Sequence, residues 1–306
     1  MLRISISAYL CFLMELTHKA GYVNIFGPPN AGKSTLLNLL LQENLAITSP
    51  KVQTTRHRIL AIITEPNFQI VLSDTPGIIE PKYKLHQKMM QQVKSAAEDA
   101  DIALLLADIT GNPEEFAALL EPYKINSKKI LLLNKVDLIK DEKERELKKQ
   151  AFESAVSATA TLTISALKQI NTDKILNLLL EHLPEGPPFF PDDNISDRPV
   201  RFFVSELIRE KIYTLYEQEI PYHTAVLIQS FEELPHITRI RADIIVTRET
   251  QKMILLGKKG AMMKQLGTMA RQSIEEFLGQ KVFLELFVKV RPKWRENDTY
   301  LREYGY

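Results

Sequence analysis

The segment Gly27–Ser34, which reads GPPNAGKS, limits the fold of this chain more than any other feature. It matches the phosphate-cradling pattern G-x-x-x-x-G-K-[ST]. An apolar run at residues 22–26 precedes it and predicts a strand, and a leucine-rich run at residues 36–41 follows it and predicts a helix. A strand, a glycine-rich loop and a helix in this order indicate an α/β fold with a mostly parallel sheet. The loop therefore predicts a phosphate-binding site.

The residue types within this loop meet separate chemical needs. The glycines let backbone NH groups turn toward phosphates, Lys33 supplies positive charge to the β- and γ-phosphates, and the Ser34 hydroxyl suits Mg²⁺. Nucleotide binding with Mg²⁺ is therefore expected. The nucleotide-contacting residues predicted here are Gly27, Pro28, Asn30, Ala31, Gly32, Lys33, Ser34 and Thr35.

A second motif, Asp74-Thr75-Pro76-Gly77, follows a strand expected over residues 69–72. It places a carboxylate at the carboxyl end of a strand, where α/β sheets bind ligands. Asp74 is expected to hold Mg²⁺ through water. The backbone NH of Gly77 can approach the γ-phosphate, and a contact available only to the triphosphate is what a switch requires.

The third motif, Asn134-Lys135-Val136-Asp137, follows a very apolar strand expected over residues 130–133. Asp137 can accept hydrogen bonds from guanine N1–H and the exocyclic amine, whereas adenine would leave this carboxylate unpaired. Lys135 would lay its aliphatic stem over the base, and Asn134 would tie the base loop to the phosphate loop. The motif predicts GTP and GDP as the nucleotides.

Ser165-Ala166 follows a β-patterned stretch at residues 160–164, and a backbone NH near Ala166 can donate to guanine O6. The tripeptide beginning at Ser165 carries little information alone, so its weight comes from the order of the motifs. The phosphate loop, D-x-x-G, N-K-x-D and S-A together resemble the translation-factor class of GTPases over residues 20–183.

The segment 51–58 is polar, basic and without periodicity, which predicts a mobile loop. A GTPase needs one threonine here to reach Mg²⁺ and the γ-phosphate. Thr55 is favoured, with Thr54 as the alternative. Arg56 and Arg58 belong either to a solvated basic loop or to a surface that binds a partner, and the sequence leaves both open.

Gly77 is followed by Ile78, whereas many small GTPases have a glutamine there to orient the attacking water. Hydrolysis is therefore expected to be slow unless another group contributes. Resemblance to GTPases with this hydrophobic substitution implies backbone groups, bridging water or K⁺, and Asn30 is the candidate to hold K⁺; alternatively, Asn30 only stabilises the loop. The predicted catalytic residues are Lys33, Thr55, Gly77 and Asn30.

Composition places the chain among soluble two-domain proteins, with 306 residues, 45% hydrophobic and 25% charged, and no apolar run long enough to span a membrane. Cys11 is the sole cysteine, so an intramolecular disulfide is excluded and a reducing cytoplasm fits best. The histidines lack metal-ligand spacing. Residues 1–13 superficially resemble a secretory signal without a cleavage site and are expected to form a disordered extension.

The segment 183–194 is rich in proline and marks a domain boundary. A GTPase domain is expected over residues 14–183, a linker over 184–199 and a second domain over 200–306. From residue 237 to the end there are 14 Lys and Arg against 8 Asp and Glu, whereas the remainder has 25 against 30. A basic end on an otherwise acidic chain predicts a polyanionic partner.

The second domain resembles a type II KH domain, an α+β fold that binds single-stranded RNA. Its expected order is a helix over 200–216, strands over 224–232 and 237–247, a G-x-x-G loop at Gly257–Gly260, a helix to 277 and a strand over 282–290. The alternative is a basic turn in a small α/β domain. Sequence choice is expected from groove residues such as Ile254, Leu255, Met262 and Ile245, many of which are expected to pack the core as well. The predicted RNA-binding residues are Gly257, Lys258, Lys259, Gly260, Ile254, Lys264, Arg291, Lys293 and Trp294, the last either stacking on a base or closing the core.

Over residues 15–306 the chain resembles the Era family of bacterial GTPases. The likeness is carried by the run 53–58, the D-T-P-G motif, the proline-rich linker, the G-K-K-G loop and the closing residues 301–306. It implies hydrolysis of GTP to GDP and phosphate, binding of the 16S rRNA 3′ end, small ribosomal subunit assembly, peripheral association with the inner membrane, and a monomer. Two alternatives stay open: a GTP-regulated scaffold for membrane or protein partners, and a P-loop ATPase or kinase.

Overall fold

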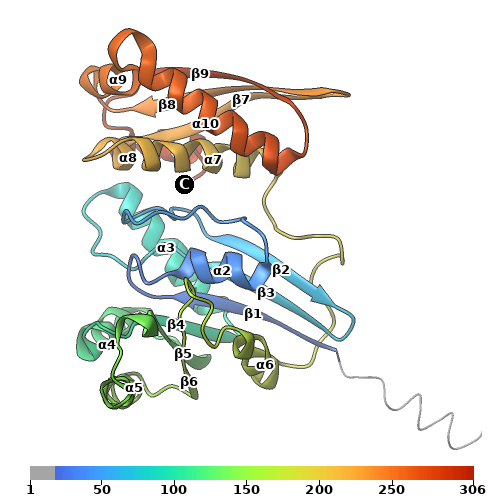
Figure 1. The fold of residues 1–306 in the computed structure, drawn as a ribbon, viewed down its shortest axis with the longest axis vertical. Helices are drawn as coiled ribbons and strands as arrows, with labels where there is room; N and C mark the ends of the chain where they lie inside the picture. The colour runs from blue at the N-terminus through green and yellow to red at the C-terminus, as the bar shows by residue number, and fades with distance from the viewer. Residues whose placement is uncertain (1–17) are drawn as a thin grey trace, which may run out of the picture.

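The computed structural model describes residues 18–306, which form two units, each built on its own β-sheet (Figure 1). The expected extension at residues 1–13 lies outside the described residues. The predicted class, an α/β domain with a mostly parallel sheet followed by an α+β domain, is confirmed. Among the described residues, no helix is both long and apolar enough to cross a membrane.

The first unit is a six-stranded sheet in the order β2-β3-β1-β4-β5-β6. All neighbouring strands are parallel except the β2–β3 pair, which is antiparallel. The central strands are apolar on both faces because helices cover both sides of a parallel sheet. The elements are β1 (Lys19–Phe26), α2 (Lys33–Leu41), β2 (Ile59–Glu65), β3 (Phe68–Asp74), α3 (Lys84–Asp99), β4 (Ile102–Asp108), α4 (Pro113–Leu120), β5 (Lys128–Asn134), α5 (Glu142–Val156), β6 (Ala160–Thr163) and α6 (Asp173–His182), with 3-10 turns η1 (Glu121–Tyr123) and η2 (Val136–Leu138).

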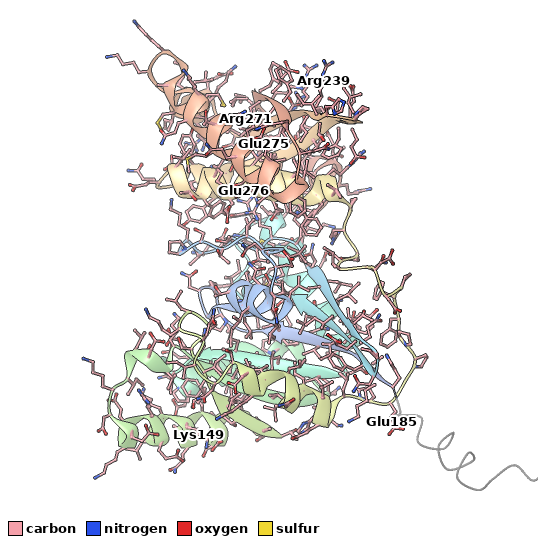
Figure 2. All side chains as sticks on the ribbon, turned by 45° about the vertical axis from the view of Figure 1, so that its right-hand side comes forward. Lys149, Glu185, Arg239, Arg271, Glu275 and Glu276 are labelled. Carbon is pink, nitrogen blue, oxygen red and sulfur yellow. The ribbon has the colours of Figure 1, made fainter. Side chains whose placement is uncertain are left out.

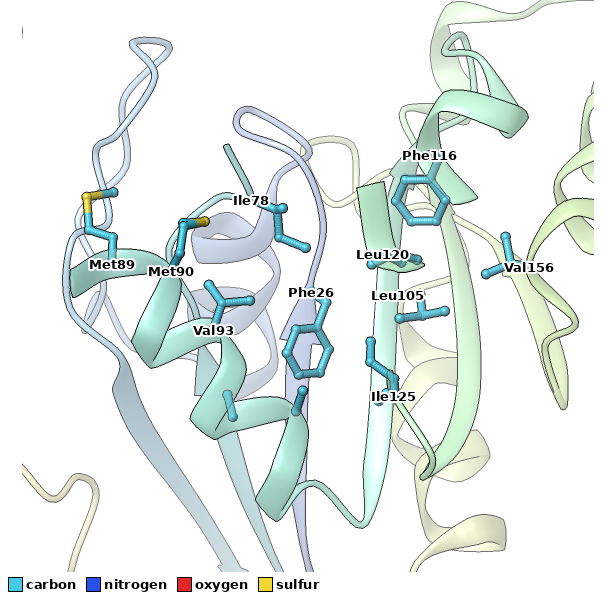
Figure 3. Close-up of a cluster of buried hydrophobic side chains, with 14 of the residues drawn as sticks. Phe26, Ile78, Met89, Met90, Val93, Leu105, Phe116, Leu120, Ile125 and Val156 are labelled. Carbon is cyan, nitrogen blue, oxygen red and sulfur yellow. The ribbon is translucent and has the colours of Figure 1, made fainter. Parts of the chain in front are cut away.

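The core beneath one face of this sheet lies between the strands and the helices α3 and α4. Phe26 of β1 and Leu105 of β4 are fully buried there and face Val93 of α3 and Phe116 of α4 (Figure 3). Burying each such side chain contributes about 1.5–3 kcal/mol. This packing fixes the carboxyl ends of the strands, where the sequence motifs lie.

The second unit is a three-stranded sheet in which β7 and β8 are antiparallel and β8 and β9 are parallel. Helices α7 and α10 pack against one of its faces. The predicted element order is correct, with strand and helix ends displaced by one or two residues. The elements are α7 (Val200–Leu215), α8 (Ile220–His223), β7 (Ala225–Leu234), β8 (Ile237–Val246), α9 (Glu249–Leu256), η3 (Lys258–Gly260), α10 (Ala261–Leu278), β9 (Val282–Val290), η4 (Trp294–Glu296) and α11 (Asp298–Glu303).

The segment 184–199 runs along the first sheet rather than hanging free of it. The fully buried Gln69 side chain accepts from Phe190 N at 2.9 Å and donates to Phe190 O at 2.9 Å. Further along, Ser196 Oγ donates to Leu60 O at 2.5 Å. The connection between the two units is therefore tied to β2 and β3 by hydrogen bonds.

The two units share part of one hydrophobic core. Trp294 and Leu301, which follow the last strand of the second unit, belong to the same buried cluster as Met89 and Val93 of α3. At its edge, Lys84 pairs with Asp298. The C-terminal end of the described chain therefore lies between the units (Figure 1).

Candidate nucleotide site and its junction with the second domain

The phosphate loop has the backbone conformation that its glycines predict. Gly32 has φ +100°, and a Cβ at this position would lie 2.4 Å from Asn134 Nδ2, so only glycine fits without displacing its neighbour. The Lys33 ammonium donates to Gly27 O at 3.1 Å and to Pro28 O at 2.8 Å. Burial lowers the pKa of Lys33 to about 8, partly opposed by the Asp74 carboxylate. The loop therefore holds a buried cation directed at its own carbonyl groups.

Three oxygen atoms from different elements meet beside this lysine. Ser34 Oγ lies 2.7 Å from Asp74 Oδ2 and 2.8 Å from Thr55 Oγ1, which is itself 3.1 Å from Asp74 Oδ2. Burial raises the pKa of Asp74, while hydrogen bonds from Ser34 and Thr55 and the charge of Lys33 act to lower it. Asp74 Oδ1 is buried without a hydrogen-bond partner.

This oxygen cluster fits Mg²⁺, a hard cation that prefers oxygen ligands. The unpartnered Oδ1 of Asp74 is the kind of buried acceptor that a hydrated cation would satisfy. The structure brings Thr55 to the cluster, whereas the Thr54 hydroxyl donates to Lys51 O at 2.6 Å. In the described part of the chain, no group of three or more His, Cys, Asp or Glu side chains offers another metal site.

Asn134 joins three loops at the other end of the site. Its Nδ2 donates to Ala31 O at 2.7 Å and its Oδ1 accepts from Ala166 N at 2.9 Å. Lys135 is held by Asp108 at 2.7 Å, a partner that sequence reasoning missed because Asp108 lies at the end of a different strand. The base loop, the phosphate loop and the Ser165 turn are thereby fixed to one another.

A cavity between these loops has the shape of a base site, with Asp137 and Lys135 on its wall. Exposed apolar side chains of Leu138 and Leu167 line it as well. Residues 48–50 also line the cavity. They belong to no recognisable motif, so nothing in the sequence indicated this role. The lining residues are Asn30, Gly32, Thr35, Thr48, Ser49, Pro50, Asn134, Lys135, Asp137, Leu138, Ser165, Ala166 and Leu167.

The segment after Asp74 packs directly against the phosphate loop. A Cβ on Gly77 would lie 2.9 Å from the backbone of Pro29, and Ile78 N donates to Gly27 O at 3.1 Å. The Ile78 side chain is buried in the core. This aliphatic side chain has no polar group with which to orient an attacking water. Asn30, on the loop itself, donates from Nδ2 to Pro50 O at 2.9 Å.

Of the two interpretations of Arg56, the solvated basic loop is wrong, because Arg56 is fully buried against the second unit. Its guanidinium donates to Thr224 O at 2.6 Å, to Pro221 O at 2.9 Å and to Tyr213 Oη at 3.2 Å. A guanidinium presents five N–H donors in a planar fork and can satisfy several backbone carbonyls at once. Arg56 is therefore the centre of the junction.

Other residues of this loop extend the junction on both sides of Arg56. The His57 ring stacks on Tyr306 with centroids 4.4 Å apart. Lys51 Nζ donates to Tyr213 O at 2.6 Å at the carboxyl end of α7, and Arg209 of α7 donates to Thr54 O. The residues on either side of Thr55 are thus both held by the second unit.

Arg58 has a different environment, within the first unit. It pairs with Asp99 at 2.5 Å, and its Nε donates to Ser73 Oγ at 2.7 Å. The solvated-loop interpretation is therefore wrong for this arginine too. Its contacts anchor the end of the loop to β3 and α3.

In the second unit, the G-x-x-G loop connects α9 to α10, and its two lysines are exposed. Gly257 has φ +69° and packs so tightly that a Cβ would lie 2.5 Å from the Met262 side chain. Lys258, Lys259, Ile254 and, missed from sequence, Met253 are exposed around it. Exposed residues also include Lys264, Arg291 and Lys293.

Three residues that the sequence allowed either as base contacts or as core residues are buried. Trp294 is fully buried and donates its indole N–H to His223 O at 3.0 Å, so base stacking by this side chain is wrong for this structure. The other interpretation, that it closes the core, is the one observed. Leu255 and Ile245 are also buried and line the core rather than the surface.

Comparison with known proteins agrees with this architecture. The family model described as a 50S ribosome-binding GTPase matches residues 22–135, and a KH domain model matches residues 219–295. The GTPase Era of Geotalea daltonii is 41% identical over 297 residues, covering 96% of this chain and all of the relative.

Two solved structures are similar over nearly the whole chain. They are Aquifex aeolicus Era bound to GDP and AlF4⁻, and Era in complex with MgGDPNP and nucleotides 1506–1542 of 16S ribosomal RNA. Each has a TM-score of 0.90 and 40% identity, and the match covers 94% of this chain and 99% of the other. With this likeness, and with the phosphate loop, the base cavity and the G-x-x-G loop in place, the chain belongs to the Era family of GTPases and binds guanine nucleotides.

Proposed function

We propose that this protein is a GTP-driven switch that binds 16S rRNA through its KH domain and assists assembly of the small ribosomal subunit. The similar Era structure with MgGDPNP and a 16S rRNA fragment supports this proposal. The observation that carries it is the junction, because the loop that bears Thr55 is held by Arg209 on one side and contacts Thr224 through Arg56 on the other. Because these contacts flank Thr55, a movement of Thr55 away from the Ser34–Asp74 cluster would change them.

In this proposal, GTP orders the loops around Thr55 and Gly77 through contacts with the γ-phosphate. That ordering alters how the KH domain lies on the GTPase domain and exposes its RNA groove, and hydrolysis reverses it. The domain division proposed for this switch is a GTPase domain at 14–183, a linker at 184–199 and a KH domain at 200–306. RNA binding is favoured over the scaffold alternative by the similar Era structure that holds nucleotides 1506–1542 of 16S ribosomal RNA.

Ser34, Thr55 and Asp74 would hold Mg²⁺, which supplies charge neutralisation for the β- and γ-phosphates. Lys33 would neutralise the same phosphate oxygens with its ammonium group. Because the Nδ2 of Asn30 is used by Pro50, its oxygen is the group left for K⁺, a second proposed source of charge stabilisation. Lys33, Thr55, Gly77 and Asn30 are the proposed catalytic residues.

The family resemblance also implies properties that no contact described here bears on. We extend the proposal to a cytoplasmic monomer that associates peripherally with the inner membrane. Fractionation of cells into soluble and membrane pools, together with light scattering of the purified protein, tests both. An integral-membrane pool resistant to high salt, or a stable oligomer, would contradict it.

GTP affinity is expected to fall as the pH rises above about 8. Lys33 in the free protein has its pKa lowered to about 8, and a bound triphosphate favours the charged form and raises this pKa. Binding of GTP near pH 8.5 should therefore be accompanied by proton uptake at Lys33. The affinity for GTP should fall by up to about tenfold for each pH unit above the pKa of Lys33 in the free protein. Calorimetry in two buffers of different ionisation enthalpy measures the uptake; identical heats in both at pH 8.5 would contradict it.

Replacing Lys258 and Lys259 together by Glu is expected to weaken RNA binding by roughly 100-fold and to reduce the salt dependence by about two counterions. The two ammonium groups are exposed on the G-x-x-G loop and would contact phosphates. Fluorescence anisotropy with a 16S 3′-end oligonucleotide at several salt concentrations measures both quantities.

The matched control reverses Lys143 and Lys149 on α5. Lys149 lies at the opposite end of the molecule from Arg271 and Glu275 of α10 (Figure 2). This control should bind RNA as the wild type does. Wild-type RNA affinity in the loop variant would instead favour the scaffold function.

A further inference from the structure

A small cavity of about 90 Å³ lies in the junction between the two domains, apart from the nucleotide site and the G-x-x-G loop. His57 of the Thr55-bearing loop forms one wall, and Arg198, Ser205 and Arg209 form another. Tyr306 closes the end. A site of this volume exceeds the space that one water molecule needs, about 10–15 Å³ on this measure.

Three nitrogen atoms of the residues lining this cavity are buried without hydrogen-bond partners. They are His57 Nδ1, Arg198 Nε and Arg209 Nη1. The remaining nitrogens of Arg209 are used by Glu206 and by Thr54 O, and Arg198 Nε is 3.8 Å from Asp197, too far for a hydrogen bond. Buried donors are nearly always satisfied, so a cluster of three requires an explanation.

The charge around the cavity is also unbalanced. Arg56 is fully buried, and its hydrogen-bond partners within residues 18–306 are carbonyl and phenol oxygens rather than a carboxylate. Arg198 and Arg209 add two further positive charges, and Glu206 and Asp197 supply two negative ones. Among these five side chains, one positive charge is left over, and it is Arg56 that is fully buried without a carboxylate partner, where an uncompensated charge is costly.

The pKa of His57 reflects the same surroundings. Burial lowers it to about 4, with Glu206 opposing and Arg209, Arg198 and Arg56 adding to the effect. The imidazole is therefore neutral at physiological pH and can donate from one ring nitrogen. An anion beside it would accept this donor as well as the two guanidinium groups.

We propose that this cavity binds one small tetrahedral oxyanion, of which inorganic phosphate is the example, between the Thr55-bearing loop and α7. The several oxygens of such an anion suit the three unpartnered nitrogens on the residues that line the cavity, and its negative charge offsets the positive charge of the arginines. Water would satisfy some of the donors but leave the charge in place. The anion would bridge His57 of the GTPase domain and Arg209 of the KH domain and so stabilise their docked arrangement, whether or not RNA is bound.

The test uses full-length protein saturated with GDP and Mg²⁺, so that the phosphate loop is already filled. Crystals grown with selenate should show an anomalous peak within hydrogen-bond distance of Arg209 Nη1 and Arg198 Nε. Calorimetry with inorganic phosphate should give one site per chain with a Kd of about 1 mM or lower, and saturating phosphate should raise the Tm by about 5 °C. Waters alone in the cavity, or no phosphate-dependent Tm shift, would overturn the proposal.

Two variants separate anion binding from ordinary packing. Arg198→Gln should weaken phosphate binding roughly tenfold, the loss of about one charge-assisted hydrogen bond, whereas Arg201→Gln, an exposed neighbour on α7, should not. Ser205→Asp places a carboxylate in the cavity and should remove the phosphate dependence while retaining the higher Tm. Ser205→Asn, of the same size but neutral, should not reproduce this. Equal phosphate dependence in Ser205→Asp and Ser205→Asn would overturn the proposal.

Discussion

Replacing Asp137 by Asn is expected to lower the affinity for GTP by about 10²–10⁴, because two hydrogen bonds to a charged group contribute about 1.5–3 kcal/mol each. The Asp137 carboxylate lines the cavity between Lys135 and Leu138, where guanine N1–H and the exocyclic amine would donate to it. An amide at this position offers a donor as well as an acceptor and therefore matches the second carbonyl of xanthine. Calorimetry with GTP, XTP and ATP measures the change in preference.

The matched control for this variant is Asp141→Asn. Asp141 caps α5 four residues further along, accepting from Lys143 N at 3.1 Å, and is not part of the cavity. Its replacement should leave the order of nucleotide affinities unchanged. XTP binding no tighter in Asp137→Asn than in the wild type would show that the carboxylate does not read the base.

Replacing Arg56 by Ala is expected to cost roughly 3 kcal/mol in the interaction between the domains, because it leaves buried acceptors at Thr224 and Pro221 without their donor. The side chain is fully buried, so solvent does not screen these contacts. Melting that is cooperative across both domains in the wild type should separate into two transitions. Differential scanning calorimetry with GDP and Mg²⁺ present measures this directly.

Arg201→Ala is the control for Arg56→Ala, since Arg201 is an exposed arginine on the face of α7 away from the junction. It should melt as the wild type does. A single transition at the wild-type Tm in Arg56→Ala would mean that the other contacts, among them the shared apolar core around Trp294 and the Arg209–Thr54 hydrogen bond, suffice to hold the domains together.

The sequence predicted those parts of the site in which a short motif contains both the residue and the backbone conformation that its function needs. The Gly32 conformation, the Lys33 ammonium and the Asp74 carboxylate each follow from a short motif at the end of a strand, and the sheet then brings them together. Strand interiors such as 130–133 were visible because both faces are apolar. The ends of the strands could not be predicted in this way. For example, the polar residues Lys128 and Asn134 extend β5 through backbone pairing with β4.

What could not be predicted depends on contacts between distant parts of the chain. From the sequence alone, Arg56 is indistinguishable from a surface arginine, because its partners Tyr213 and Thr224 are more than 150 residues away along the chain. The sequence around Trp294 is compatible with a residue that stacks on a base and with a core residue. Trp294 is buried because it packs in one cluster with α3 of the other domain. Asp108 and residues 48–50 carry no motif, so only the fold shows that they line or support the base site.

The central claim is that nucleotide state is communicated to the KH domain through the loop containing Thr55 and Arg56. The measurement that tests it most directly is the affinity of full-length protein for a 16S 3′-end oligonucleotide with GDPNP and with GDP. We expect at least about tenfold tighter RNA binding with GDPNP in the wild type, within the usual range of coupling between sites, and nearly equal affinities in Arg56→Ala. Equal RNA affinity with the two nucleotides in the wild type would contradict the account.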